Sequence, residues 1–349
     1  MRRRTGELLL ALGSVFFLAL VLGIAELAVR TFSAVDLVGN SKNLFVAGAW
    51  GKSHGNAPNA EAISFGAPVY TDELGFRVPQ GGVPGDAGKA EAILILGDSV
   101  GFGPAVEEAD TFAGLLRVRF SAKRIYNSSV IGYSTPDYRN LVDAFMPLHP
   151  EVSRVVLVYC LNDVSAASAR NIDRFVSRKD ESVPHPNLTE RLRSWAWISD
   201  ANDYLRSRSK LYLFVRHRLL GTQVRDWNEV LQLYSEERSA DLEHAVGDVA
   251  AIAATLKERA IPLVVVIAPF EYQLRQPDDP MSQVPQRRLV ELMSRAGVQP
   301  IDPRPRFDAS RPSSDYFLAY DAMHFSAAGH RVIADVIADA LTDTSMARE

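Results

Sequence analysis

Two short segments, far apart in the chain, contain the residue types that nucleophilic catalysis requires. Ser99 ends the segment 93–99 (ILILGDS), an apolar run of strand-forming residues, and Gly101 and Gly103 follow it closely. Short apolar runs bounded by glycine are typical of buried parallel strands, and α/β sheets bind their ligands at the carboxyl ends of such strands. The Ser99 hydroxyl therefore stands where this kind of sheet presents a nucleophile.

The second segment is 320–326 (YDAMHFS), in which Asp321 and His324 lie three positions apart, just before a helical pattern of apolar residues. A carboxylate this close can orient the imidazole, fix its tautomer and stabilise the imidazolium that forms when the histidine takes a serine proton. Taken alone, such an Asp-x-x-His pair is more often a pair of solvent-exposed polar residues or part of a helix cap. Beside a nucleophilic serine it supplies a base and an orienting acid.

Two further segments follow strand-like runs, namely 127–135 (NSSVIGYST) and 157–163 (LVYCLND). Acyl transfer also needs hydrogen-bond donors where negative charge develops. An asparagine amide such as that of Asn162 carries hydrogens without charge, and a glycine such as Gly132 lets the backbone approach a substrate closely. Taken singly, Gly132 is better explained as a turn residue, and Asn162 with Asp163 as a helix cap.

In order and rough spacing, the four segments resemble the blocks of the SGNH (GDSL-type) hydrolase superfamily: Gly-Asp-Ser, a glycine after the second strand, Gly-x-Asn-Asp and Asp-x-x-His. The resemblance implies that Ser99 is the nucleophile, His324 the base and Asp321 its orienting acid. It further implies an oxyanion hole formed by the Ser99 amide, the Gly132 amide and the Asn162 side chain. The chemistry it implies needs neither a metal nor an organic cofactor.

The resemblance covers about residues 70–340 and contains one departure, because Cys160 stands where the family usually carries glycine. Cys160 is the only cysteine of the chain, which excludes an intramolecular disulfide. Its place at the end of an apolar strand predicts a buried, unreactive thiol. The substitution bears on where the nearby Asn162 donor lies.

The N-terminus predicts a membrane anchor. After the arginines at positions 2–4, residues 8–25 form an uncharged apolar stretch, and about 18 residues are enough to cross a membrane. The arginines predict a cytoplasmic N-terminus and export of the chain beyond about residue 30. We find no clear cleavage site and expect an uncleaved anchor, with a cleaved signal peptide as the alternative. The segment 71–77 (TDELGFR) resembles the approach to Gly-Asp-Ser in membrane-anchored bacterial members of the superfamily, which are linked to polysaccharide modification.

The composition is that of an ordinary globular protein, with 47% hydrophobic and 23% charged residues and a net charge of −4. The sequence has no basic stripe with interleaved aromatic residues, no phosphate-binding glycine loop with lysine, and no His/Cys cluster at metal-ligand spacing. We therefore predict no nucleic acid partner and no metal site.

Strand and helix patterns alternate along the chain after residue 90. Strands are predicted at about 92–96, 124–127, 154–159, 262–268 and 298–301, with helices at 240–259 and 284–296. Right-handed crossovers then give an α/β fold, a three-layer α/β/α sandwich around a mainly parallel five-stranded sheet of the flavodoxin-like SGNH type. The predicted parts are a cytoplasmic tip and transmembrane anchor (1–30), a linker and irregular N-terminal extension (31–90), and a catalytic domain (91–345).

Within the catalytic domain, about residues 165–240 are predicted to form a helical insertion, too long for a simple crossover. Long insertions at this edge of a sheet often act as lids. Its aromatic residues suit the wall of a sugar or acyl pocket, although a helical subdomain that packs its own core is the favoured alternative; they are Trp195, Trp197, Tyr204, Tyr212, Phe214 and Trp227.

Together these patterns predict a serine esterase of SGNH type, anchored in the bacterial inner membrane with its catalytic domain on the periplasmic side. It would remove or transfer a small acyl group, with acetyl as the expected one, on a cell-envelope or exported polysaccharide. The expected partners are an acylated glycan or lipid substrate and the membrane. A lysophospholipase- or thioesterase-type lipid esterase and a non-catalytic glycan-binding or assembly component are the alternatives. No motif distinguishes hydrolysis from acyl transfer.

Overall fold

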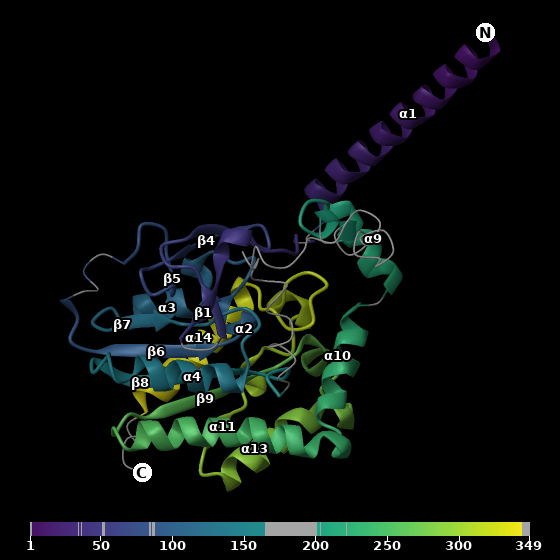
Figure 1. Ribbon diagram of the computed structural model, residues 1–349. Coiled ribbons are helices and arrows are strands. Elements are labelled where there is room, and N and C mark those ends of the chain that lie inside the picture. Colours follow the sequence, from purple (N-terminus) through teal and green to yellow (C-terminus); the bar gives the residue numbers. More distant parts are fainter. Residues whose placement is uncertain are drawn as a thin grey trace, which may run out of the picture. The chain divides into compact units, whose positions relative to one another are not determined.

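The computed structural model (Figure 1) describes residues 2–33, 35, 37–50, 53–83, 85, 88–164, 201–202, 204–220 and 222–343. Trp195 and Trp197 lie outside the described residues. The chain divides into two units, Met1–Gly39 with His185–Gly221, and Asn40–Pro184 with Thr222–Glu349. We describe each unit separately.

The larger unit is built on an eight-stranded sheet with the order β10-β9-β8-β6-β7-β5-β4-β3. Its parallel strands are β6 (Ala92–Gly97), β7 (Arg124–Asn127), β8 (Val152–Cys160), β9 (Leu263–Ala268) and β10 (Pro300–Ile301). In chain order these five strands stand 2-1-3-4-5 across the sheet, which is the flavodoxin-like order. The predicted α/β fold with a mainly parallel sheet is confirmed, and the whole sheet is larger than the five strands predicted.

The central strands are buried on both faces. All six residues of β6 are buried, and β8 and β9 carry continuous runs of valine, leucine and isoleucine. Such runs are typical of parallel strands that helices cover on both sides. The helices of this unit are α2 (Ser99–Phe102), α3 (Phe112–Arg119), α4 (Thr135–Phe145), α10 (Thr222–Leu233), α11 (Ser239–Lys257), α12 (Glu271–Arg275), α13 (Val284–Arg295) and α14 (Ala327–Thr342). Among them α3 packs against α14, while α11 packs against α4 and α13.

Residues 31–90 were predicted to be irregular, whereas the structure places five strands there. β3 (Glu61–Ser64), β4 (Ala67–Thr71) and β5 (Arg77–Val78) extend the main sheet in antiparallel fashion, and β5 pairs with β7. β1 (Phe45–Ala49) and β2 (Ser53–Asn56) form a separate two-stranded sheet. Buried and exposed residues alternate along β3, the period-two pattern of a half-buried strand. The strands are short and interrupted by glycines, so the pattern is weak.

The smaller unit contains α1 (Arg2–Phe32) and α9 (Lys210–Leu220). Among the described residues, the segment Leu10–Phe32 of α1 is the one helix long and apolar enough to cross a membrane. Near its end, the Glu26 carboxylate accepts hydrogen bonds from the Lys210 amide (3.0 Å), the Leu211 amide (2.9 Å) and the Ser209 hydroxyl (2.8 Å). These bonds fix the first turn of α9 to α1.

The described part of the insertion is helical, as predicted. Trp227 of α10 is only 2% exposed and stacks on Tyr272, with ring centroids 5.1 Å apart. Its indole also lies 6.2 Å from the ring of Phe270. Trp227 therefore packs on residues outside the insertion, in the core of the larger unit, which is neither the predicted pocket wall nor a core of the insertion's own.

Candidate active site

The nucleophile stands on a tight turn from strand to helix. Ser99 is the first residue of α2, directly after β6, and its side chain is among the buried polar groups, at 8% exposure. The Asp98 carboxylate accepts the Val100 amide at 2.7 Å and so caps this short helix. A Cβ at position 101 would lie 2.5 Å from the hydroxyl oxygen and 3.1 Å from the Cβ of Ser129, so a side chain there would displace Ser129. The backbone of the turn thus packs closely against the Ser129 side chain.

A buried arginine holds the loop that follows α2. The Arg77 guanidinium donates hydrogen bonds to the carbonyls of Phe102, Gly103 (2.6 Å) and Val106 (2.5 Å), and it lies 4.9 Å from the Phe102 ring. Burial lowers the pKa of Arg77 to about 10, which Glu108 partly opposes, so the group stays charged at neutral pH. Arg77 comes from the segment 71–77 that the sequence analysis singled out, and its clamp fixes the backbone around the nucleophile.

Ser99, His324 and Asp321 form one continuous chain of hydrogen bonds. His324 Nε2 lies 2.8 Å from Ser99 Oγ, and His324 Nδ1 lies 2.8 Å from Asp321 Oδ2. Asp321 Oδ1 in turn accepts the backbone amides of Met323 and His324, each at 2.8 Å. The carboxylate is therefore fixed by the backbone, and it keeps the proton of a neutral imidazole on Nδ1, which leaves Nε2 free to accept the serine proton.

The charges around His324 favour a basic imidazole. Burial lowers the pKa of His324, but the charge and hydrogen bond of Asp321, together with the charge of Asp98, outweigh burial, so the pKa lies above 6.5. For Asp321, burial raises the pKa, and the His324 charge and the hydrogen bonds to its two oxygens bring it below 3.8. Asp321 is thus ionised at neutral pH and stabilises the imidazolium that proton transfer creates.

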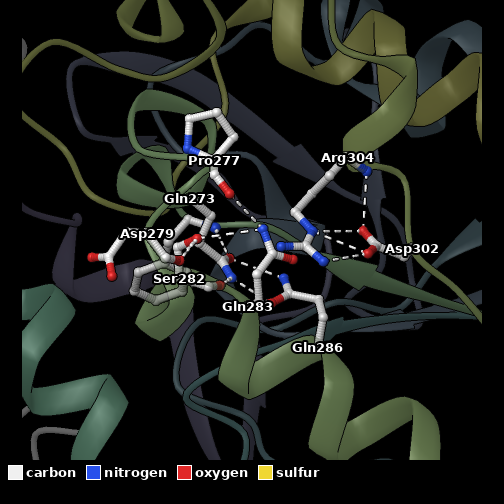
Figure 2. A network of polar contacts seen from close by, with 9 residues as sticks. Gln273, Pro277, Asp279, Ser282, Gln283, Gln286, Asp302 and Arg304 are labelled. Atoms are coloured by element: carbon white, nitrogen blue, oxygen red, sulfur yellow. Dashed lines mark hydrogen bonds and ion pairs between the residues drawn. The ribbon is translucent and has the colours of Figure 1, made fainter.

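The loop that carries the acid and the base is held from α12. The Glu271 amide, at the start of α12, donates to the Ala322 carbonyl at 2.8 Å. Gln273 and Gln286 exchange hydrogen bonds through both of their amide groups, and Gln273 also donates to the Ser282 carbonyl at 2.6 Å (Figure 2). Because both glutamines are 1% exposed, this network fixes α12 to α13 and thereby supports the loop.

The expected oxyanion donors follow three neighbouring strands. Ser99 follows β6, Gly132 lies beyond β7, and Asn162 comes directly after β8. Gly132 has φ +86°, a left-handed conformation that favours glycine. Its turn is held by His54 of β2, whose Nε2 donates to the Ile131 carbonyl at 2.8 Å.

The side chain of Asn162 points toward the loop of the acid and base. Its Nδ2 lies 3.9 Å from the sulfur of Met323, the residue before His324. The structure thus brings the Asn162 side chain to the loop that carries the acid and the base. Its role as an oxyanion donor stays a prediction, as does that of the Gly132 amide.

Asp163, which the sequence analysis named only as part of a helix cap, is a buried acidic group. Asp163 accepts the Tyr138 hydroxyl and the Cys160 amide, both at 2.9 Å. Burial, followed by the charge of Asp98, raises the pKa of Asp163 well above its ordinary value. Cys160 is 0% exposed, and burial and the two carboxylates raise the pKa of its thiol, so it is buried as predicted. The Asn-Asp motif contains Asp163, but it gives no indication that the side chain of Asp163 is buried.

A hydroxyl at the carboxyl end of a parallel strand, in hydrogen-bonded series with an imidazole and a carboxylate, makes the arrangement of a serine hydrolase. The hydroxyl is activated by the base, and the base is held in one tautomer by the acid. Among the described residues, no group of three or more His, Cys, Asp and Glu side chains is placed to hold a metal ion.

Comparison with known proteins gives similar folds but no relative by sequence. No family model and no curated protein matches the sequence. A member of the lipolytic G-D-S-L family from Veillonella parvula is 12% identical, with 72% of this chain and 99% of that chain covered and a TM-score of 0.42. A lipase/acylhydrolase from Enterococcus faecalis is 14% identical, with 72% and 95% covered and a TM-score of 0.39. An acetylxylan esterase from Geobacillus stearothermophilus is 13% identical, with 73% and 95% covered and a TM-score of 0.41.

The chemistry assigned to this chain rests on the geometry of its own residues.

Proposed function

We propose that this chain is a membrane-anchored serine esterase of SGNH type, which removes or transfers a small acyl group, acetyl, on a cell-envelope or exported polysaccharide. The observation that carries the proposal is the unbroken series Ser99 Oγ, His324 Nε2, His324 Nδ1 and Asp321 Oδ2, with both hydrogen bonds at 2.8 Å. A structural serine has no need of a base fixed in this way.

The reaction follows from these positions. Ser99 Oγ attacks the ester carbonyl while His324 Nε2 takes the hydroxyl proton, and the Asp321 carboxylate stabilises the imidazolium. The amides of Ser99 and Gly132 and the side chain of Asn162 donate hydrogen bonds to the oxyanion. His324 then gives its proton to the departing alcohol oxygen, which leaves an acyl group on Ser99. A water molecule or a sugar hydroxyl, deprotonated by His324, then attacks the acyl carbon. The bond from this carbon to Ser99 Oγ breaks, and His324 returns the proton to Ser99 Oγ.

The glycan substrate and the location rest on the resemblance and on the N-terminal helix. The resemblance is to membrane-anchored bacterial proteins linked to polysaccharide modification, and α1 supplies a segment that can span a membrane. The arginines at the start of α1 favour a cytoplasmic N-terminus, and with it a periplasmic catalytic domain at the inner membrane.

A lipid esterase of lysophospholipase or thioesterase type is the second candidate. The same helix favours it, because an anchored enzyme stays close to lipid. The two candidates differ in acyl length, since an acetylesterase needs room for two carbons and a lipid esterase for a long chain. A non-catalytic glycan-binding or assembly component would not need Ser99, His324 and Asp321 in one hydrogen-bonded series.

The test is hydrolysis of p-nitrophenyl esters from acetate to palmitate by the full chain in mild detergent. We expect the highest kcat/KM on acetate, and loss of turnover in Ser99→Ala with unchanged thermal stability. Ser128→Ala is a matched control, because Ser128 is a buried serine whose hydroxyl is bonded to a carbonyl and not to His324. A preference for long esters would favour the lipid esterase. Equal activity of Ser99→Ala and the wild type would overturn the proposal.

A further inference from the structure

The turn between β3 and β4 has an unusual residue at its tip. Ser64 of β3 pairs with Ala67 of β4, so the hairpin is closed by the two residues Phe65 and Gly66. Both have positive φ, +49° for Phe65 and +85° for Gly66. Positive φ at both central residues is what a type I′ turn requires.

Phenylalanine is a poor choice for this backbone. Asparagine, aspartate and glycine are the usual first residues of such turns, and a bulky side chain at positive φ is an outlier. Residues held in sparsely populated conformations persist where the surrounding structure determines them, and they cluster at functional sites. The unusual backbone conformation of Phe65 therefore suggests that the contacts of its ring serve a function.

The Phe65 ring lies against the imidazole of His324. The ring centroids are 5.5 Å apart and the ring planes stand at 75°, the edge-to-face arrangement that aromatic pairs prefer. Two bonds fix the tip of the hairpin: the Ser64 carbonyl accepts the Ala105 amide at 3.2 Å, and the Ser64 hydroxyl donates to Asn40 at 2.6 Å. The fixed turn thus presents an aromatic ring, half-buried, beside the base of the active site.

The chemistry of His324 tells which part of the substrate meets this ring. His324 Nε2 gives its proton to the alcohol oxygen that leaves, and later takes one from the hydroxyl that attacks the acyl group. A side chain packed on the imidazole therefore borders the alcohol part of the ester. The acyl carbonyl belongs with the proposed oxyanion donors, the amides of Ser99 and Gly132 and the Asn162 side chain.

We propose that Phe65 is a specificity-determining residue, whose ring forms a wall of the subsite for the alcohol part of the ester and favours a sugar ring there. The apolar C–H face of a sugar buries surface against an aromatic ring, whereas a small alcohol has too little surface to do so. The proposal rests on the proposed esterase function. It gives the N-terminal extension, through its β3–β4 hairpin, a direct part in substrate selection.

The experiment compares two acetate esters that differ in the alcohol, glucose pentaacetate and ethyl acetate, by acetate release from the full chain in detergent. The variant is Phe65→Asn, because asparagine suits positive φ and preserves the turn. We expect its kcat/KM on glucose pentaacetate to fall about 2- to 12-fold, chiefly through KM. Turnover of ethyl acetate stays within about twofold. Phe65→Tyr, which keeps the ring, retains the preference for the sugar ester.

Ile63→Ala is the matched control, since Ile63 lies in the same hairpin but is 54% exposed. It leaves both rates unchanged. Phe65→Gly, which adopts the same backbone conformation, gives an independent measurement of the loss of the ring. Equal losses on both esters would overturn the proposal by showing that the ring only positions His324, and unchanged rates would overturn it as well. Absence of Ser99-dependent turnover in the wild type would instead refute the esterase function, and the selection proposal with it.

Discussion

The pKa of His324 links its surroundings to the rate of the reaction. Only the neutral imidazole can accept the Ser99 proton, so kcat/KM rises with pH through this pKa. Burial alone lowers the pKa, and Asp321 together with the charge of Asp98 more than reverses that effect, so the pKa is raised above its ordinary value.

Asp321→Asn removes the charge that raises the pKa of His324, and burial then dominates. We expect the midpoint of the pH profile of kcat/KM to move to lower pH. We also expect kcat to fall by up to about 10⁴-fold, because the imidazole is no longer held in the tautomer that carries its proton on Nδ1. The profile is measured on p-nitrophenyl acetate from pH 5 to 9. Asp315→Asn is a control, because this aspartate is more exposed and does not contact His324. An unchanged midpoint would show that Asp321 does not set the basicity of His324.

Short motifs predicted Ser99, Asp321 and His324, because the acid and base are adjacent on one loop and the nucleophile ends an unmistakable strand. Phe65 could not be predicted in the same way. Its contact with His324 joins residues far apart in the sequence and depends on a turn whose backbone disfavours phenylalanine. The burial of Asp163 likewise depends on its contact with Tyr138 and on its position just after the buried strand β8.

At the scale of elements, the loop after α2 depends on one side chain. Arg77 of β5 donates hydrogen bonds to three backbone carbonyls, one at the end of α2 and two in the loop that follows it. Lysine carries the same charge but cannot present several donors in a planar fork.

Arg77→Lys should therefore leave carbonyls unsatisfied and destabilise the protein by about 1–3 kcal/mol. We also expect a lower kcat on p-nitrophenyl acetate, because the backbone around Ser99 loosens. Urea unfolding in detergent measures the first effect and steady-state kinetics the second. Arg119→Lys is the control: Arg119 is exposed on α3 and pairs with Asp335 at the surface, so a change below about 0.5 kcal/mol is expected. Equal stability of the two variants would contradict the clamp.

The elements that the sequence predicted well are those with continuous apolar runs. β6, β8 and β9 are buried on both faces, so their sequences leave little alternative to a strand. β3, β4 and β5 were missed because strands of two to five residues with glycine turns resemble irregular chain. Their role as an extension of the sheet depends on the pairing of β5 with β7, which no local pattern indicates.

The topology of the whole sheet explains why the site is where it is. β6 lies between β7 and β8, so the chain leaves β6 in one direction and returns on its other side. Ligands of open α/β sheets bind at such a switch point, outside the carboxyl ends of the strands. In this sheet the switch point lies between β6 and β8. Ser99 follows β6, and Asn162 follows β8.

The proposed membrane anchoring concerns the whole molecule and has its own test. We expect the chain to pellet with bacterial membranes, to resist alkaline carbonate, and to keep its full mass of 38.4 kDa, as an uncleaved anchor requires. Arginine in place of both Leu18 and Leu22 should release it, at about 2.5–3.5 kcal/mol for each charge at the helix centre. Val118→Arg, at an exposed apolar position of the larger unit, is the control. Extraction of the wild type by carbonate would contradict the anchor.

Whether Ser99 is a nucleophile activated by His324 and Asp321 is measured most directly by covalent labelling with a fluorophosphonate, which reacts with activated serines whatever their substrate. The full chain in detergent is treated with the reagent, digested and analysed by mass spectrometry. We expect one phosphonylated residue, Ser99, and loss of labelling in Ser99→Ala and His324→Ala, while Ser128→Ala labels normally. An unlabelled wild type, or labelling that is independent of His324, would contradict this expectation.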